Sequence, residues 1–368
     1  MKTKKTNQPE TLPKQPSPRR AAFVAALATA LLTALVVWWF NGREGPNDRA
    51  DRADRDLAAA KLAMDIGNFA TAEEHLRSAV ERMPESAVLQ HNLGVLYLRM
   101  DRKADARAAF ERAAKAHPPE AQAVRAEEYF QLASISVTEK DWKRAEGELQ
   151  QAIAADPNRR LFHARLIDLQ LGSLKEPAAA ESSAARFLRT CGDDAENLHA
   201  IGFIYTQQKD YVRAEFWGRE AVARDDTVTK AHALVANSLA RQGRGREAVQ
   251  YLAPLLEKQP RNGELWIARA RVAMSLGDRR AVIEAADQAV RALPNSFEAH
   301  LIRMQALGGA GRLEEAVAEA GRARAVAADA TDHRRLRTEE ATLQRALQMQ
   351  NRLIVGGAAG SDTTGARP

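Results

Sequence analysis

The chain has 368 residues, of which 45% are hydrophobic and 5% are aromatic, so it holds enough apolar material for a folded body of one or two domains. Its formal net charge of +6 is concentrated at the start, because residues 1–20 contribute +5 and the chain from residue 41 onward only +1. This distribution argues against nucleic acid as a partner. The single cysteine, Cys191, excludes an intrachain disulfide framework and a cysteine-rich zinc site.

Residues 21–40, AAFVAALATALLTALVVWWF, form a run without charge, proline or glycine. A helix of that length rises about 30 Å, the thickness of the hydrocarbon core of a bilayer. Trp38 and Trp39 lie where an interfacial aromatic belt is found. A cleaved signal peptide is the alternative, but the run exceeds a typical signal core and no A-x-A site precedes NGREG. We therefore expect an uncleaved transmembrane signal anchor in contact with the lipid bilayer.

The flanks of this segment set its expected orientation. Six Lys or Arg residues precede it within residues 1–20, and four Arg residues follow it within the next 20. The positive-inside rule then keeps the N-terminus in the cytoplasm and places the body in the periplasm, beyond a bacterial inner membrane. Residues 1–20 are predicted to be a disordered basic cytosolic arm, and residues 41–52, NGREGPNDRADR, a polar linker.

Between residues 53 and 328, small residues recur at fixed offsets. Moving 12, 16, 19 and 24 residues forward from Gly94 reaches, in turn, Ala106, Phe110, Ala113 and Pro118. The same offsets recur, with substitutions, from Ala60, Ala133, Gly202, Ala236, Ala270 and Met304. Most of these starting points are 34 residues apart, a register that chance does not keep.

A 34-residue period with this composition resembles the tetratricopeptide repeat. The segments LGVLYL at residues 93–98 and ADARAAFERAAKAHP at residues 104–118 look like a consensus unit of that family. The resemblance implies an all-α fold: a right-handed superhelical solenoid of about eight helix pairs, preceded by an N-terminal transmembrane helix and closed by a C-terminal capping helix. Gly94 is then a packing residue where two helices cross.

Two departures from the period carry information. Going from Gly94 to Ala133 takes 39 residues, which indicates about five extra residues near 121–125 that lengthen a helix or a loop. Going from Ala133 to Gly202 takes 69 residues, which indicates a degenerate fourth unit across residues 160–193, without the closing proline. We expect that unit to be a flexible joint between three N-terminal and four C-terminal repeats.

The repeats are followed by one further predicted helix. Leu336, Leu343 and Leu347 recur at near-heptad spacing within residues 332–352. We expect this helix to cap the apolar face of the last repeat, with self-association through it as the alternative. Residues 354–368, IVGGAAGSDTTGARP, are expected to be disordered.

The histidines do not predict a catalytic or metal site. Five of the eight fall at similar places in the first helices of their units: His91, His163, His199, His232 and His300. Neighbouring units stack about 10 Å apart, so equivalent side chains cannot share one ion. Three of them match the position of Trp266, which favours packing. Because no phosphate-binding, zinc-peptidase, hydrolase or dinucleotide motif is present either, we expect no enzyme activity, metal or cofactor.

By the resemblance, the first helices line a concave groove that suits an extended peptide or a helix of another protein. Of the carboxylate clamp known in the family, only Asn92 is in place, and Glu127 and Gln131 stand where basic groups are needed. A cytosolic chaperone adaptor is therefore disfavoured. The alternative for each groove residue is an ordinary solvated surface position. The predicted groove residues are Asn92, Val95, Phe130, Ser134, Arg165, Asp168, His199, Phe203, Asn237, Arg241, Ile267 and Arg271.

Charge is divided unevenly along the body, since residues 41–228 carry a net charge of −5 and residues 229–352 a net charge of +6. The two parts could offer opposite surfaces to different partners or attract each other between molecules, although scattered surface charge is the commoner explanation.

Together these features predict a membrane-anchored scaffold that mediates protein–protein interactions in the cell envelope, in assembly, secretion or polysaccharide export. The alternative is a regulatory or accessory subunit of a membrane enzyme, such as a glycosyltransferase or a cytochrome maturation factor. A cytosol-facing adaptor resembling the lipopolysaccharide-regulating repeat proteins is disfavoured by the charged flanks and by the absence of a C-terminal CxxC module.

Overall fold

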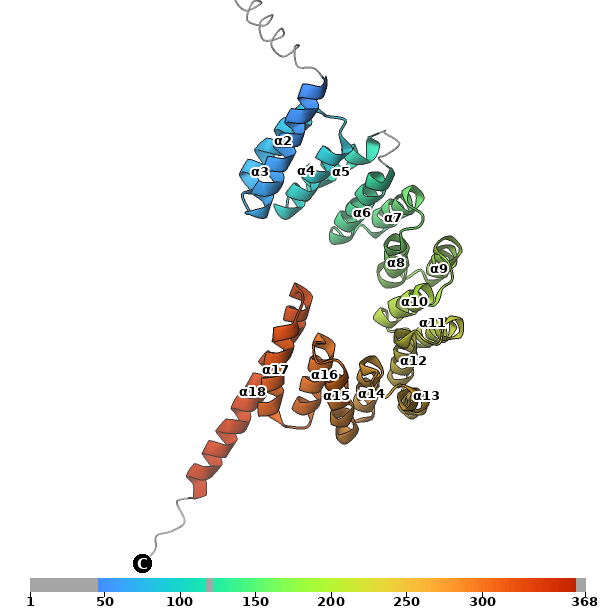
Figure 1. The fold of residues 1–368 in the computed structure, drawn as a ribbon, viewed down its shortest axis with the longest axis vertical. Coiled ribbons are helices and arrows are strands. Elements are labelled where there is room, and N and C mark those ends of the chain that lie inside the picture. Colours follow the sequence, from blue (N-terminus) through green and yellow to red (C-terminus); the bar gives the residue numbers. More distant parts are fainter. Residues whose placement is uncertain (1–45, 117–121, 362–368) are drawn as a thin grey trace, which may run out of the picture. The chain divides into compact units, whose positions relative to one another are not determined.

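The computed structural model describes residues 46–116 and 122–361, and every regular element in these residues is a helix (Figure 1). The all-α fold of paired helices predicted from the repeats is therefore confirmed for this part of the chain. The chain divides into two compact units, residues 1–128 (unit 1) and residues 129–368 (unit 2), with the division inside helix α6.

The helices form eight consecutive pairs followed by a long terminal helix. Up to the division they are α2 (Pro46–Asp65), α3 (Phe69–Arg82), α4 (Ala87–Arg99), α5 (Lys103–Lys115) and α6 (Gln122–Thr138). Unit 2 continues with α7 (Trp142–Ala155), α8 (Arg160–Leu169), the π-helix η2 (Gln170–Leu174), α9 (Pro177–Cys191), α10 (Ala195–Gln207), α11 (Tyr211–Arg224), α12 (Thr229–Arg241), α13 (Gly245–Lys258), α14 (Gly263–Leu276), α15 (Arg279–Ala292), α16 (Phe297–Gly309), α17 (Leu313–Val326) and α18 (Ala330–Ser361).

Each pair turns from its first to its second helix at one residue in the left-handed backbone conformation, with φ between 56° and 82°. These residues are Gly67, Asp101, Lys140, Lys175, Lys209, Gly243, Gly277 and Gly311. After four of them, an Asn or Asp side chain accepts a hydrogen bond from the backbone N–H three residues on and so caps the second helix: Asn68, Asp141, Asp210 and Asp278. The turns thus repeat in chemistry as well as in spacing.

A second recurrent bond fixes the start of six of the pairs, those that begin with α4, α8, α10, α12, α14 and α16. A side-chain N–H near the beginning of the first helix donates to the backbone carbonyl six residues earlier, in the turn from the preceding pair. The donors are Gln90, His163, Asn197, His232, Trp266 and His300, with nitrogen-to-oxygen distances of 2.8 to 3.3 Å. All three of these histidines are buried, so their predicted packing role is confirmed.

Gly94 lies against a neighbouring side chain, as its place in the repeat predicts. A Cβ atom at this position would lie 2.5 Å from Cε1 of Phe110, whose ring is fully buried on α5. The glycine therefore makes room for an aromatic ring of the second helix, and this packing offsets its cost to α4 of about 1 kcal/mol.

One predicted boundary in unit 1 is wrong. Helix α2 begins at Pro46, so residues 46–52 of the predicted linker are helical. Proline suits the first turn of a helix, and Ala53 is buried in a cluster with Ala79 and Leu89, which holds this end of α2 in place. The rest of the predicted linker, residues 41–45, lies outside the described residues.

The structure bears on both departures from the 34-residue period, the extra residues near 121–125 and the fourth pair. The extra residues near 121–125 fall at the start of α6, which at 17 residues is longer than the 13-residue α4. The fourth pair is not where the chain divides, because the division lies at residues 128 and 129. In the fourth pair, Ile167, Ala184 and Phe187 share one apolar cluster with Ile201 of the next pair, which makes it a continuous part of unit 2.

Helix α18 covers the end of the last pair. Leu336 is buried and Leu343 packs against the same cluster, which includes Leu307 and Ala320 of α16 and α17. The helix continues to Ser361, so the boundary predicted at residue 352 is too early, and residues 354–361 are helical rather than disordered.

No helix in residues 46–116 and 122–361 combines the length and the apolar composition that crossing a bilayer requires. The anchor expected at residues 21–40, the arm expected at residues 1–20 and residues 362–368 of the expected tail lie outside the described residues.

Candidate protein-binding groove

The predicted groove residues of unit 1 lie on α4. Asn92 and Val95 are both half-buried, and the Asn92 side chain donates to the Val88 carbonyl at 2.7 Å. The amide is therefore already engaged with its own helix. The remaining ten predicted residues belong to unit 2, where the first helices of the pairs present two hollows.

The first of these, which we call the apolar hollow, has a volume of about 400 Å³ and contains four predicted residues: Phe130, Ser134, Arg165 and Asp168. Phe130 is half-buried, and its ring centroid lies 5.1 Å from that of Phe162. Val137 and Leu169 add aliphatic surface. Phe130 is thus both a wall of the hollow and a packing neighbour of the core.

The polar edge of the apolar hollow depends on the π-helix η2. Gln208 donates from Nε2 to Oδ1 of Asp168 at 2.8 Å. Gly172 lies beside this amide, and a Cβ atom there would be 2.9 Å from Gln208 Nε2. A π-helical turn inserts a residue and often marks a functional site. Here it brings Gly172 and Ser173 into the lining, an arrangement that a 34-residue pattern does not reveal.

His199 and Phe203 lie on α10, whose C-terminal end lines the second of the two hollows. Their rings stack with centroids 6.4 Å apart, and Phe203 is 50% exposed. Burial lowers the pKa of His199, and the charge of Lys230 acts in the same direction. This pair therefore presents an uncharged aromatic surface at neutral pH.

The second hollow, which we call the cationic hollow, has a volume of about 670 Å³ and contains three predicted residues: Asn237, Arg241 and Arg271. Its lining also includes Lys209 and Tyr211 at the α10–α11 turn, Met274 on α14, Glu298 and Ile302 on α16, and Arg335 on α18. The last contribution comes from the capping helix, so this hollow combines residues from four successive pairs, α10–α11 to α16–α17, and the terminal helix.

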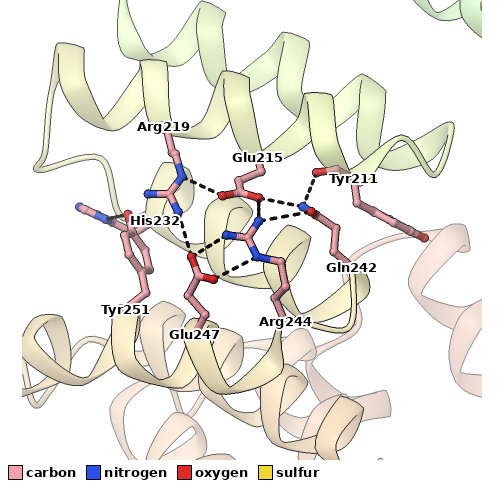
Figure 2. Close-up of polar contacts among 8 residues, drawn as sticks. All are labelled: Tyr211, Glu215, Arg219, His232, Gln242, Arg244, Glu247 and Tyr251. Atoms are coloured by element: carbon pink, nitrogen blue, oxygen red, sulfur yellow. Dashed lines mark hydrogen bonds and ion pairs between the residues drawn. The ribbon is translucent and has the colours of Figure 1, made fainter.

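Arg241 is oriented by Tyr211, and Tyr211 belongs to a polar network whose other members are drawn in Figure 2. Arg241 donates to the Tyr211 hydroxyl from Nη2 at 2.9 Å, and the next residue, Gln242, donates to the Tyr211 carbonyl at 3.0 Å. Gln242 also donates to Glu215 at 2.8 Å, and Arg244 donates to the same carboxylate at 2.7 Å. The turn from α12 to α13 is thus held against α11, which fixes the end of α12 that carries Arg241.

Figure 2 also shows how this network closes. Arg219 donates to Glu215 at 2.8 Å, and Glu247 accepts two bonds from Arg244 at 2.6 and 3.0 Å. Burial would raise the pKa of Glu215, but the hydrogen bonds from Gln242 and Arg219 and the nearby guanidinium charges outweigh it, so the pKa lies below its ordinary value. The carboxylate is ionised and holds two successive pairs together.

The prediction that Ile267 faces the groove is wrong. It is 2% exposed and packs in a cluster with Ala270, Ala299 and Ile302, because α16 covers this face of α14. Its side chain therefore belongs to the core between two pairs. Conversely, Lys209, Tyr211 and Arg335 line a hollow and were not predicted, since they lie in a turn, at the start of a second helix and on the terminal helix. Within the described ranges, no group of three or more His, Cys, Asp or Glu residues is placed to hold a metal ion.

Comparison with known families bears on two stretches of the chain. Models described as tetratricopeptide repeat match residues 63–128 and residues 236–279. The two matched segments together cover less than a third of the chain. Tetratricopeptide-repeat proteins bind other proteins or peptides, and the helix pairs between and after the matched segments have the same two-helix form. No curated protein matches the chain.

Solved structures with similar arrangements have low sequence identity. A tetratricopeptide repeat protein from Parabacteroides merdae is 15% identical over 79% of this chain and 99% of its own, with a TM-score of 0.44. PilF of Pseudomonas aeruginosa is 16% identical over 70% of this chain and 99% of its own, with a TM-score of 0.32. YrrB, described as having an unusual peptide-binding site, is 17% identical over 62% of this chain and 97% of its own, with a TM-score of 0.29.

Proposed function

We propose that this chain is a scaffold that binds segments of other proteins along the first helices of unit 2. The observation that carries the proposal is Phe203, a half-exposed aromatic side chain on α10, a first helix whose C-terminal end lines the cationic hollow. Exposed aromatic and arginine side chains beside a hollow are common anchors of protein interfaces. The repeat family, whose members bind proteins or peptides, supports the same function.

The scaffold acts, in this proposal, in the bacterial cell envelope. Residues 21–40 hold it in the inner membrane, and the distribution of Lys and Arg around them directs the repeats to the periplasm. The sequence of the anchor and its flanks supports this location. The partners are then envelope proteins in assembly, secretion or polysaccharide export.

The chain offers a matched control for testing the groove. Phe203 on α10 and Phe216 on α11 are 50% and 54% exposed, but Phe216 lies on the second helix of the same pair. We expect Phe203→Ala, in the full chain expressed in its membrane, to reduce the set of proteins recovered by chemical crosslinking, and Phe216→Ala to leave it unchanged. Adding Phe130→Ala should weaken capture further. Equal recovery from the Phe203 and Phe216 variants would contradict binding in the groove.

A further inference from the structure

The cationic hollow has more positive charge than its own carboxylate neutralises. Four cations line it, Lys209, Arg241, Arg271 and Arg335, and the one carboxylate is Glu298. Glu298 forms ion pairs with Arg271 and with Arg335, the latter at 3.0 Å. Burial acts to raise the pKa of Glu298, but the two guanidinium groups outweigh it and lower the pKa below its ordinary value. The hollow therefore keeps an excess of three positive charges at neutral pH.

Two of the four cations have no carboxylate partner among the described residues. Arg241 is oriented by a hydroxyl, that of Tyr211, and its guanidinium carbon lies 5.2 Å from the centre of the tyrosine ring. Lys209 is exposed at the left-handed turn between α10 and α11. Arg241 is thus held in place without being neutralised, the state in which a guanidinium binds an external carboxylate most effectively.

The remaining lining of the hollow is aliphatic and amide. Met274, which is 36% exposed, supplies apolar surface beside the cations. The Oδ1 atom of Asn237 is buried and has no hydrogen-bond partner in the part of the chain that the structure describes. A backbone N–H of a bound peptide would satisfy this acceptor, which is unfavourable without a partner.

We propose that the cationic hollow binds an acidic protein segment whose apolar side chains alternate with carboxylates. The carboxylates pair with Arg241 and Lys209, an apolar side chain contacts Met274, and a backbone N–H donates to Asn237. The proposal rests on the groove function proposed above and specifies its partner class. A nucleic acid is the weaker candidate, because the chain from residue 41 onward is nearly neutral.

The test uses three labelled twelve-residue peptides and the full chain in detergent. Each peptide alternates leucine with one polar residue: glutamate, glutamine or lysine. We expect the glutamate peptide to bind about tenfold more tightly than the glutamine peptide, measured by fluorescence anisotropy at low salt, and to weaken as salt rises. The lysine peptide should not bind.

The double variant K209Q/R241Q should lose about tenfold in affinity for the glutamate peptide. The double variant R279Q/R280Q removes the same charge from exposed arginines on α15, a second helix, and should change affinity by less than about twofold. Melting curves of both variants should match that of the unmodified chain, since all four side chains are exposed.

The failures of the two proposals are distinguishable. If the glutamate and glutamine peptides bind equally, or if both double variants lose affinity equally, the acidic partner is wrong, while Phe203→Ala still tests the groove. Absence of binding by all three peptides would also overturn the acidic partner, and crosslinking in cells would then decide the groove separately. A twelve-nucleotide single-stranded DNA that displaces the glutamate peptide at equal concentration would replace the protein segment with a nucleic acid.

Discussion

Leu62 and Leu96 occupy the same position in successive repeats, yet Leu62 is 66% exposed and Leu96 is fully buried. The position packs against the preceding pair: its counterpart in unit 2, Val272, lies in a cluster with Val235 and Leu239 of α12. No pair precedes α2 within the described residues. Leu62 is therefore exposed, because within the described residues no helix pair packs on this face of α2.

This difference predicts unequal effects of one substitution. We expect Leu96→Ala to lower the free energy of unfolding by about 2–5 kcal/mol, because it leaves a cavity between two pairs. We expect Leu62→Ala to change it by less than about 0.5 kcal/mol, because its side chain is mostly in solvent. Urea denaturation of the two variants provides the measurement. Similar losses would show that another element covers Leu62 in the native protein.

Two helical glycines should respond to alanine with opposite signs. A Cβ atom at Gly94 meets the buried Phe110 ring, whereas one at Gly147, on α7, meets nothing within 4 Å. Overpacking typically costs about 1–3 kcal/mol, more than the gain in helix propensity of about 1 kcal/mol. Gly94→Ala should therefore destabilise the chain and Gly147→Ala stabilise it by up to about 1 kcal/mol. Hydrogen exchange should locate the loss in α4 and α5, and unchanged protection there would refute the register of the repeats.

The left-handed lysines are a source of strain that glycine should relieve. Lys175 has φ of 59°, a conformation that costs a residue with a Cβ atom about 1–2 kcal/mol. Glycine removes that cost, but its greater backbone freedom in the unfolded chain offsets part of the gain. The net effect of Lys175→Gly should be to stabilise unit 2 by about 0.5–1 kcal/mol. Lys61→Gly, in the interior of α2, should instead destabilise unit 1 by about 1 kcal/mol. Thermal melting compares the two, and a loss of stability in both would count against strain at Lys175.

The pair His91 and Glu128 predicts how stability changes with pH. Nδ1 of His91 lies 2.7 Å from Oε1 of Glu128; this hydrogen bond raises the pKa of His91 above 6.5, and burial raises the pKa of Glu128 above 4.5. The folded chain holds both protons more tightly than the unfolded chain. The stability from His91 is therefore fully present below pH 6.5 and is lost as pH rises through its raised pKa.

Melting of unit 1 should accordingly move to lower temperature between pH 6 and pH 8, and His91→Gln should flatten that dependence. His163 provides a contrast, because burial lowers its pKa below 6.5. Its contribution is present above pH 6.5 and is lost as pH falls through that value, since the unfolded chain then binds the proton more readily. A pH profile that is identical in the His91→Gln variant would contradict the role of the pair.

The proposed orientation in the membrane has a direct test. A reporter enzyme that is active only outside the cytoplasm, fused after Pro368, should be active, because the Lys and Arg residues of the N-terminal arm favour the cytoplasm. The matched control is a reporter active only in the cytoplasm, fused at the same residue. Activity of that control alone would place the repeats on the cytoplasmic side.

The spacing of small residues predicted the pairs because each one reports a local packing requirement. Gly94 and its counterparts mark first helices, and the turn residues Asn68 and Asp210 mark the starts of second helices. The same reasoning could not find the π-helix η2 or the left-handed Lys209. Both depend on how a turn closes against neighbouring pairs, and residue type leaves that open.

The groove was predicted less completely, for a physical reason. A first-helix position faces either the groove or the next pair, and the register alone did not show that α16 covers Ile267. The cationic hollow also receives Lys209 from a turn and Arg335 from the terminal helix, about 65 residues beyond Arg271. Only the packing of α18 brings that arginine to the hollow.

The hydrogen bond to the carbonyl six residues earlier also determines how readily each buried histidine reacts with reagents and metal ions. At His163 and His232 the carbonyl accepts from Nε2, so that nitrogen carries the proton, and at His232 Nδ1 accepts from the Tyr251 hydroxyl at 2.7 Å. A reagent that acylates imidazole, or a metal ion on an affinity resin, must first break the Nε2 bond. His333 is exposed, and it should therefore react with such a reagent well before the buried histidines of the described residues that join the pairs.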